Sequence, residues 1–226
     1  MSRNPNIRVL AAPTAGVDIH VPEVLRYMGL GRAQPDARVA ALAQEALGLF
    51  CAAARYAACA LQVAVVIEGD EITLGALRLK SADLARNLAG CERAVLFVAT
   101  AGMETERQRK RAAVTAQPLS LALDAVGTAA IECFCDLLCL RFAQEFPALS
   151  PRPRFSPGYG DLSIDAQRPL LDMLEAERLI GVALTDALLM LPQKSVSAII
   201  GLAKNGCTFT TPDCAACGKQ ECTFRL

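Results

Sequence analysis

The sequence predicts an α+β fold, with helices flanking a twisted sheet that is largely antiparallel or mixed. Three observations support this. Helical spacing and β-branched runs both occur, one pair of runs reads as a hairpin, and strict alternation of strand and helix is absent. The chain has 226 residues and is 53% hydrophobic, enough for one domain with a substantial core. We expect that domain over residues 1–203 and a Cys-rich tail over residues 204–226.

The first elements are helical. Residues 22–29 begin with Pro and end with Gly, which is typical of a short helix. Residues 36–58 carry apolar side chains at steps of three and four, which predicts a long amphipathic helix. From residue 61 the composition changes from Ala-rich to Val-rich, so we expect a buried strand to follow directly.

The next stretch predicts a hairpin and a central strand. Residues 62–67 are mostly β-branched, and Gly69-Asp70 is a turn signal before a second arm over residues 72–79. The alternation of the second arm slips near Gly75, which predicts a bulge there. Residues 94–99 are apolar on both faces, so they should lie in the middle of the sheet.

Three helices are expected around and after that central strand. Ser81 or Asp83 can cap a short helix that ends at Leu88. Residues 102–114 are strongly charged and predict a solvated helix, with an acidic partner or a phosphate as the less favoured interpretation of its basic run. Residues 119–146 predict a long, mostly apolar helix.

The last third of the domain is broken by prolines and glycines. Residues 147–160 predict a stiff loop, because six of them are Pro or Gly. Residues 165–177 should again be helical. We expect strands over 180–184 and 197–203, with a turn of helix over 185–191 between them.

Composition excludes several classes of function. The formal net charge is zero, which argues against a general nucleic-acid binder. The most apolar stretch contains Arg55, and the N-terminus lacks the apolar core of a signal peptide, so we expect a cytoplasmic protein without a membrane span. His20 is the only histidine, and the G-x-S-x-G, P-loop and G-x-G-x-x-G motifs are missing. A Ser-His-Asp or Cys-His hydrolase would have to use this one His, and P-loop and Rossmann interpretations lack their motifs.

The ten cysteines form two sets. Six lie in apolar runs and should behave as small hydrophobic residues: Cys51, Cys59, Cys91, Cys133, Cys135 and Cys139. The other four, Cys207, Cys214, Cys217 and Cys222, cluster in the tail with a spacing that suits one tetrahedral metal centre. Cys214-Ala-Ala-Cys217-Gly-Lys is similar to a zinc knuckle. Zinc, an iron–sulfur cluster and unliganded thiols all remain open for this tail.

The Pro-rich loop is the strongest candidate for a binding site. Its sequence is Arg-Pro-Arg-Phe-Ser-Pro-Gly-Tyr-Gly over residues 152–160. An Arg fork binds carboxylate or phosphate, and Tyr offers a flat face and a hydroxyl. Proline fixes much of the backbone in advance, which lowers the entropic cost of binding. From the residues alone, an ordered surface loop without a ligand is the favoured interpretation, and a ligand site is the alternative.

Three segments in order resemble one family. Arg154-x-x-Pro-Gly-Tyr159 resembles the S-adenosylmethionine motif in the reactivation domain of cobalamin-dependent methionine synthase. Upstream, Ala-Ile-Glu132-Cys-Phe resembles the helix on which that family places a ligand-binding Glu. Downstream, Leu184-Thr, Met190-x-Pro and the Ser-Val-Ser of residues 195–197 resemble a further family segment. The resemblance covers about residues 80–203. The family's acidic N-terminal segment and its homocysteine, folate and cobalamin modules have no counterpart in the sequence.

The resemblance implies a function in corrinoid repair. Such a module supports the reductive remethylation of cob(II)alamin, with one electron from a reductase and a methyl group from S-adenosylmethionine. The cobalamin would be carried by a separate corrinoid-dependent methionine synthase or methyltransferase. The chain would then be a component of that methyltransferase activity, contributing binding and alignment and no catalytic residue of its own.

The resemblance also assigns roles to residues. Arg154 would bind the methionine carboxylate, and Glu132 would face the cationic or hydroxyl groups of the ligand. Tyr159 would pack beside the adenosyl group and the corrin, while Ser156, Gly158 and their neighbours would offer backbone groups to the adenine. The alternatives are that Glu132 pairs with Arg141 or another Arg at the core edge, and that Arg154 lies in solvent.

Two other functions stay open at this level. The chain could be a docking protein that has kept the fold, binds a corrinoid protein and has lost the ligand. It could also be a methyltransferase that acts on another small molecule. Dependence of ligand binding on Arg154 and dependence of turnover on a corrinoid separate the three.

Overall fold

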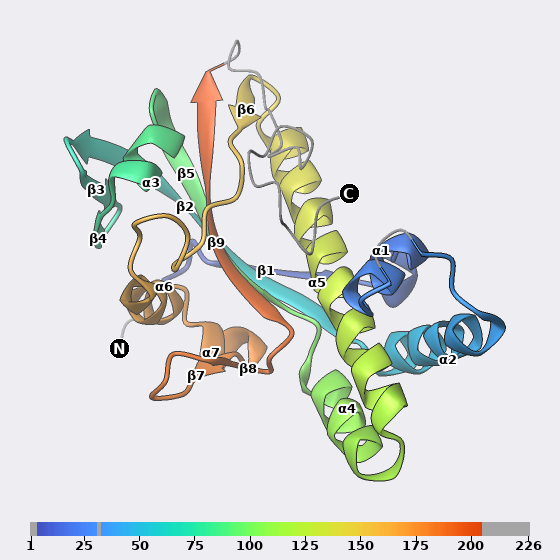
Figure 1. Ribbon diagram of the computed structural model, residues 1–226. Coiled ribbons are helices and arrows are strands. Elements are labelled where there is room, and N and C mark those ends of the chain that lie inside the picture. Colours follow the sequence, from blue (N-terminus) through green and yellow to red (C-terminus); the bar gives the residue numbers. More distant parts are fainter. Residues whose placement is uncertain (1–3, 31–32, 205–226) are drawn as a thin grey trace.

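A central antiparallel sheet with helices on both faces forms the body of the molecule (Figure 1). The computed structural model describes residues 4–30 and 33–204. The strands of the main sheet are β1 (Arg8–Ala12), β2 (Tyr56–Glu68), β3 (Glu71–Leu74), β4 (Leu77–Lys80), β5 (Cys91–Thr100), β6 (Leu149–Pro151) and β9 (Ser195–Lys204). The small strands β7 (Ala183–Leu184) and β8 (Met190–Leu191) form a separate hairpin.

The α-helices lie between these strands in the chain. They are α1 (Val21–Tyr27), α2 (Ala37–Ala53), α3 (Ala82–Asn87), α4 (Met103–Thr115), α5 (Gln117–Glu145), α6 (Gln167–Met173) and α7 (Ala176–Ile180). Two short 3-10 turns, Thr14–Gly16 and Ile164–Ala166, precede α1 and α6. Within the described ranges, no helix is both long and apolar enough to span a membrane.

All strand pairs in the main sheet are antiparallel, which confirms the predicted fold class. The order is β4-β3-β2-β5-β9-β6, and β1 pairs with the first part of β2. β5 lies between β2 and β9, as expected for the run that is apolar on both faces. β9, predicted over 197–203, begins two residues earlier and ends one later.

The sheet separates two hydrophobic cores. Alternate residues of β5, such as Val95 and Phe97, point to the core covered by α1, α2 and α5. The intervening residues, such as Leu96 and Val98, point to a second core closed by α3, α6 and α7. This two-sided burial explains why the run of β5 shows no polar alternation.

The first half of the chain departs from expectation at three points. β1 was not predicted, and β2 begins at Tyr56 although a helix was expected to continue to residue 58. The Ala-rich start of β2 is held by pairing with both β1 and β5, which overrides the helix preference of alanine. At Gly75 the chain reverses in a tight turn with φ 61°, so the expected bulge is wrong and the second arm becomes two strands.

The second half differs more. The helix expected over residues 165–177 is divided at Glu175, whose φ is 49°, and α7 then runs to Ile180, where a strand was expected. The turn of helix over 185–191 is also wrong. There the hydroxyl of Thr185 accepts a hydrogen bond from the Leu189 amide and closes the loop between β7 and β8. The remaining helices, α1, α3, α4 and α5, lie close to their predicted ranges, with Ser81 capping α3.

Candidate functional site

The Pro-rich loop is attached to the sheet by backbone hydrogen bonds. The Arg152 amide donates to the Gly201 carbonyl at 2.7 Å, one residue beyond β6. Phe155 exchanges two bonds with Ile199 of β9, at 2.9 and 2.8 Å. The sheet therefore fixes Arg154 between two paired residues, and its side chain leaves on the side of α5.

Arg154 lies against α5. Its Nη2 atom donates to a carboxylate oxygen of Glu132 and to one of Asp136, each at 2.9 Å. Glu132 and Asp136 are one helical turn apart, so one cation bridges both. We call these three residues the Arg154 cluster. Of the two alternatives set out above, Glu132 does pair with an Arg at the core edge, whereas Arg154 does not lie free in solvent.

The cluster is accessible and carries an excess of negative charge. The side chain of Arg154 is 23% exposed, that of Glu132 44% and that of Asp136 68%. Among the described residues, only Nη2 of the guanidinium donates hydrogen bonds, so Nε and Nη1 keep donors for another acceptor. One cation faces two carboxylates, which favours a ligand that carries both a carboxylate and positive charge.

Two thiols next to Arg154, those of Cys135 and Cys139, do not change the charge of the Arg154 cluster. Burial raises the pKa of Cys139 to about 11 and raises the pKa of Cys135 further. Both are therefore neutral near pH 7 and do not replace Glu132 or Asp136 as anions. All six cysteines predicted in apolar runs are buried or half-buried, as expected.

The rest of the loop presents Tyr159 to solvent. Tyr159 is 57% exposed, and its ring meets that of Phe155 edge-on with centroids 6.1 Å apart. Gly158 has φ 88°, a conformation that glycine adopts without strain. The Ser156 carbonyl accepts the Tyr159 amide at 3.0 Å and closes the turn between them. The structure therefore orders the predicted residues of this loop, and it brings Arg154 and Glu132 into contact.

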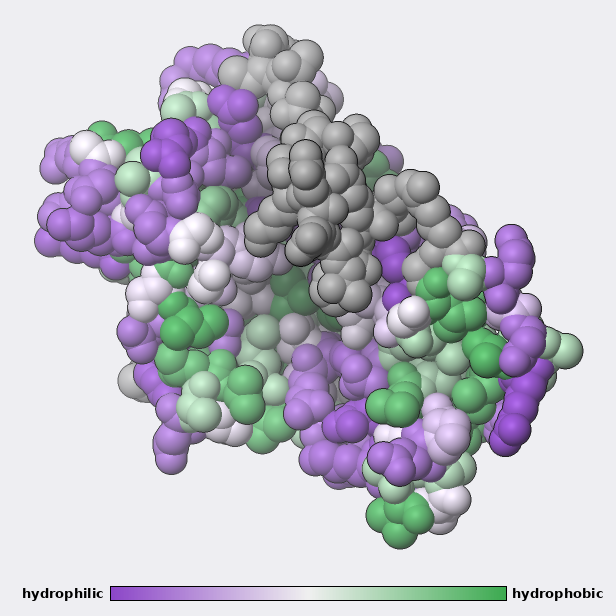
Figure 2. All heavy atoms as spheres, viewed as in Figure 1, coloured by the Kyte–Doolittle hydropathy of each residue, from purple (hydrophilic) through white to green (hydrophobic). Residues whose placement is uncertain are grey.

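Apolar side chains are exposed next to this loop. Ile164 is 44% exposed, and a Cβ on Gly158 would lie 3.4 Å from its Cδ1 atom. Leu189, at the tip between β7 and β8, is 61% exposed. Figure 2 shows hydrophobic surface in the lower left, the area of α6, α7 and the β7–β8 hairpin in Figure 1.

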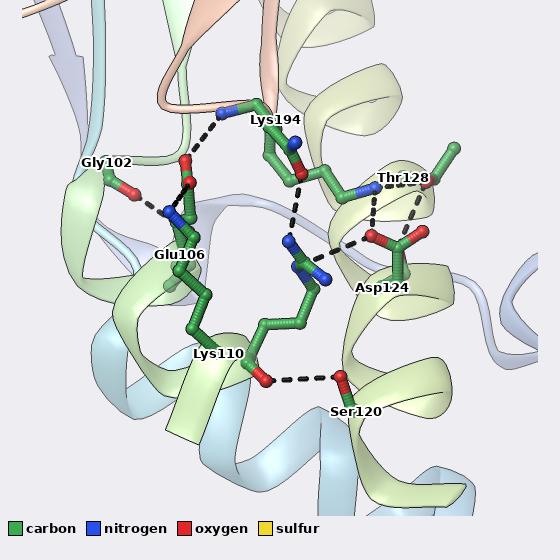
Figure 3. Close-up of polar contacts among 10 residues, drawn as sticks. Gly102, Glu106, Lys110, Ser120, Asp124, Thr128 and Lys194 are labelled. Atoms are coloured by element: carbon green, nitrogen blue, oxygen red, sulfur yellow. Dashed lines mark hydrogen bonds and ion pairs between the residues drawn. The ribbon is translucent and has the colours of Figure 1, made fainter. Parts of the chain in front are cut away.

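A second polar cluster lies nearer the N-terminal end of α5, and Figure 3 shows it in detail. Lys194 donates from Nζ to Thr128 at 2.9 Å and pairs with Asp124 at 3.0 Å. The buried carboxylate of Glu106 pairs with Lys110 at 2.6 Å and accepts the Gln193 amide at 2.9 Å.

We call these groups, together with Arg109, the Lys194 cluster. Arg109 contributes to it by donating to the Gln193 side chain at 3.0 Å. The cluster joins α4, α5 and the segment before β9. The helix expected to be solvated along its charged run thus buries one of its charges, Glu106.

Asp136 is the site residue that the sequence interpretation missed. The signal was its position four residues after Glu132 on a predicted helix, which places both carboxylates on one ridge. The same ridge continues backward to Thr128 and Asp124, so both clusters use one line of α5.

Among residues 4–30 and 33–204, no group of three or more His, Cys, Asp or Glu side chains is placed to hold a metal ion. The four cysteines predicted as metal ligands, Cys207, Cys214, Cys217 and Cys222, lie outside these described residues. The metal prediction for the tail therefore stays a prediction.

Comparisons with known proteins agree with the resemblance. A family model described as "Vitamin B12 dependent methionine synthase, activation domain" matches residues 152–219. This segment begins in the Pro-rich loop and extends past the expected boundary at residue 203. A solved structure of the MetH reactivation domain bound to AdoHcy matches with a TM-score of 0.67 and 15% identity, covering 90% of this chain and 80% of that one. No curated protein gives a significant sequence match.

Proposed function

We propose that this chain binds S-adenosylmethionine at the Arg154 cluster and supports reductive remethylation of cob(II)alamin on a separate corrinoid protein. The observation that carries the proposal is the contact between Arg154 and Glu132, two predicted ligand residues 22 positions apart. The fold match to a reactivation domain solved with AdoHcy supports it. The partner would be a corrinoid-dependent methionine synthase or methyltransferase, with a reductase as electron donor.

The residues present fit this ligand. The methionine part of S-adenosylmethionine carries a carboxylate, an ammonium group and a sulfonium. A remaining donor of Arg154, on Nε or on Nη1, would bind the carboxylate, and Glu132 and Asp136 would face the two cationic groups. Tyr159 would pack on the adenosyl group, with backbone groups near Ser156 and Gly158 available for the adenine.

The protein's contribution is binding and alignment. Bound S-adenosylmethionine supplies an electrophilic methyl group, and the corrinoid cobalt is the nucleophile that accepts it. The loop residues orient the methionine part, while the exposed ring of Tyr159 leaves room for a partner to approach. Because the donor and the corrinoid supply the reacting groups, the chain needs no acid or base of its own.

Calorimetric titration of S-adenosylmethionine into anaerobically prepared protein tests the proposal. Arg154→Ala should weaken binding by about 1.5–3 kcal/mol, the usual contribution of a hydrogen bond to a charged group. Arg141→Ala is the matched control, because Arg141 is an exposed cation on α5 that pairs only with Glu145 in the described structure. It should leave the affinity unchanged.

The alternatives give different results. If the folded wild type does not bind S-adenosylmethionine but binds a corrinoid protein, the chain is a docking protein. If methyl transfer occurs without a corrinoid, it is a methyltransferase for another small molecule. Equal effects of Arg154→Ala and Arg141→Ala would reduce the Arg154 cluster to an ordinary surface ion pair.

A further inference from the structure

The loop that carries the proposed site is held at two ends. We call residues 154–160 the donor loop. Its first end is fixed by the two backbone bonds between Phe155 and Ile199 described above. Within it, the Gly158 amide donates to the Leu162 carbonyl at 2.9 Å, and the Leu162 amide donates to the Tyr159 carbonyl at 3.0 Å. These bonds shape the turn but connect the loop only to itself and to its own continuation.

The second end is bonded to the start of α3 by two carboxylates, one on the loop side and one on the helix side. Asp161 accepts hydrogen bonds from the Ser81 hydroxyl and from the amides of Ala82 and Asp83, the latter two at 2.8 and 3.1 Å. In return, the Asp83 carboxylate accepts the Asp161 amide at 3.1 Å. We call residues 81–83, 160 and 161 the clasp. In Figure 1, the stretch between β6 and α6 turns toward α3 at this point.

Glycine at position 160 is part of the same fit. Its φ is 52°, and a Cβ built there would lie 2.2 Å from the Asp83 carboxylate oxygen. An added Cβ at residue 160 therefore forces the Asp83 carboxylate out of its position in the clasp. The bond from Ser81 and the two amide bonds also lower the pKa of the Asp161 carboxyl, which stays ionised near pH 7.

We propose that Asp161 is a positioning residue for the donor loop: by closing the clasp it holds Tyr159, two residues earlier, in the orientation that receives the adenosyl group. This inference rests on the proposed function. The physical reason is preorganisation. With Phe155 and Asp161 both fixed, the five residues between them have little freedom left to lose when a ligand binds. With the clasp open, binding must order them.

The test compares variants that open the clasp from opposite sides. Asp161→Asn weakens the acceptor, and Gly160→Ala pushes against Asp83 without changing charge. Asp165→Asn is the control for charge, because that exposed carboxylate contacts only Ser163 among the residues that the structure describes. Gly181→Ala is the control for backbone strain, because Gly181 has φ 69° with nothing within 4 Å of the added Cβ.

Two measurements are made on each full-length variant. The first is the affinity for S-adenosylmethionine by calorimetry, which we expect to fall about tenfold in both clasp variants and to stay near wild type in both controls. The second is hydrogen exchange, with faster exchange expected at the amides of residues 82, 83 and 161. A merely structural effect would instead lower the thermal midpoint and speed exchange across the molecule.

The outcomes separate this inference from the proposed function. Wild-type affinity tests the function, whereas the ratio of variant to wild type tests the clasp. If exchange rises locally but the affinity of both clasp variants equals that of wild type, Asp161 does not position the loop. If neither measurement changes, the clasp does not hold the loop at all. If wild type does not bind S-adenosylmethionine, the proposed function fails, and this inference falls with it.

Discussion

One ridge of α5 carries two polar clusters that look alike in sequence and differ in physics. Asp124, Thr128, Glu132 and Asp136 follow one another at steps of four and span ~18 Å along the helix. A cation from a neighbouring segment meets each pair: Lys194 meets the first and Arg154 the second. Both clusters therefore join α5 to the part of the chain after residue 150.

The two clusters differ in net charge and in how many of their charged groups are already paired. In the Lys194 cluster, three cations serve the two carboxylates of Glu106 and Asp124, and Glu106 also holds a backbone amide. In the Arg154 cluster, two carboxylates share a single nitrogen of one cation and remain half-exposed. The first arrangement is internally satisfied and fastens the fold. The second can still accept a cation, which is a property expected of a binding site.

Removing the buried carboxylate of the first cluster should have the largest effect. Glu106 is 4% exposed, and Glu106→Ala leaves the Gln193 amide without its acceptor. We expect the free energy of unfolding to fall by about 2–3 kcal/mol in urea titrations. The affinity for S-adenosylmethionine should not change. Glu104→Ala removes an exposed carboxylate of the same helix and serves as the control. An equal loss of stability in that variant would mean that the Lys194 cluster does not stabilise the fold more than an exposed ion pair does.

Exchanging the two cations for methionine should produce opposite phenotypes. Lys194→Met keeps the stem that packs over Gly127 but loses the bonds to Thr128 and Asp124, so we expect a stability loss of about 1–2 kcal/mol. Arg154→Met should cost little stability and reduce ligand affinity. Parallel denaturation and calorimetry on both variants measure this. If only Lys194→Met lost affinity, the ligand would bind at the Lys194 cluster and the proposed site at Arg154 would be wrong.

The negative excess of the Arg154 cluster predicts discrimination between donor and product. S-adenosylmethionine carries a sulfonium charge that S-adenosylhomocysteine lacks. Asp136→Asn and Glu132→Gln should therefore weaken the donor more than the product, by about 0.5–1 kcal/mol each, since these carboxylates are partly solvated. Competition calorimetry at two salt concentrations measures the ratio. An unchanged ratio in both variants, as in the control Asp165→Asn, would show that the carboxylates do not face the sulfonium.

Regions whose structure is set by neighbours in the sequence could be predicted, whereas regions set by contacts between distant parts of the chain could not. The start of α2, the apolar run of β5 and the Ser81 cap are set by local signals, and each appears where expected. β1 and the start of β2 depend on pairing across more than forty residues, which local propensity does not register. The family resemblance named Arg154 and Glu132 as ligand residues but did not predict that they contact each other. Asp136 could be found only from the helix face, and the clasp only from the fold.

Acidification should slightly reduce the contribution of Glu106 to the free energy of unfolding. Burial opposes ionisation of Glu106, but the bonds from Lys110 and the Gln193 amide outweigh it and lower the pKa of the carboxyl. A carboxyl with a lowered folded-state pKa stabilises the fold above its unfolded pKa, and this contribution disappears as pH falls through the folded-state value. We therefore expect the stability difference between wild type and Glu106→Gln to shrink from pH 7 to pH 4, by about 1 kcal/mol or less. Urea titrations at both values measure it, with Glu104→Gln as the control. A difference that grows on acidification would mean that Glu106 is held in its protonated form, and that the cations of this cluster are stabilised by something other than its charge.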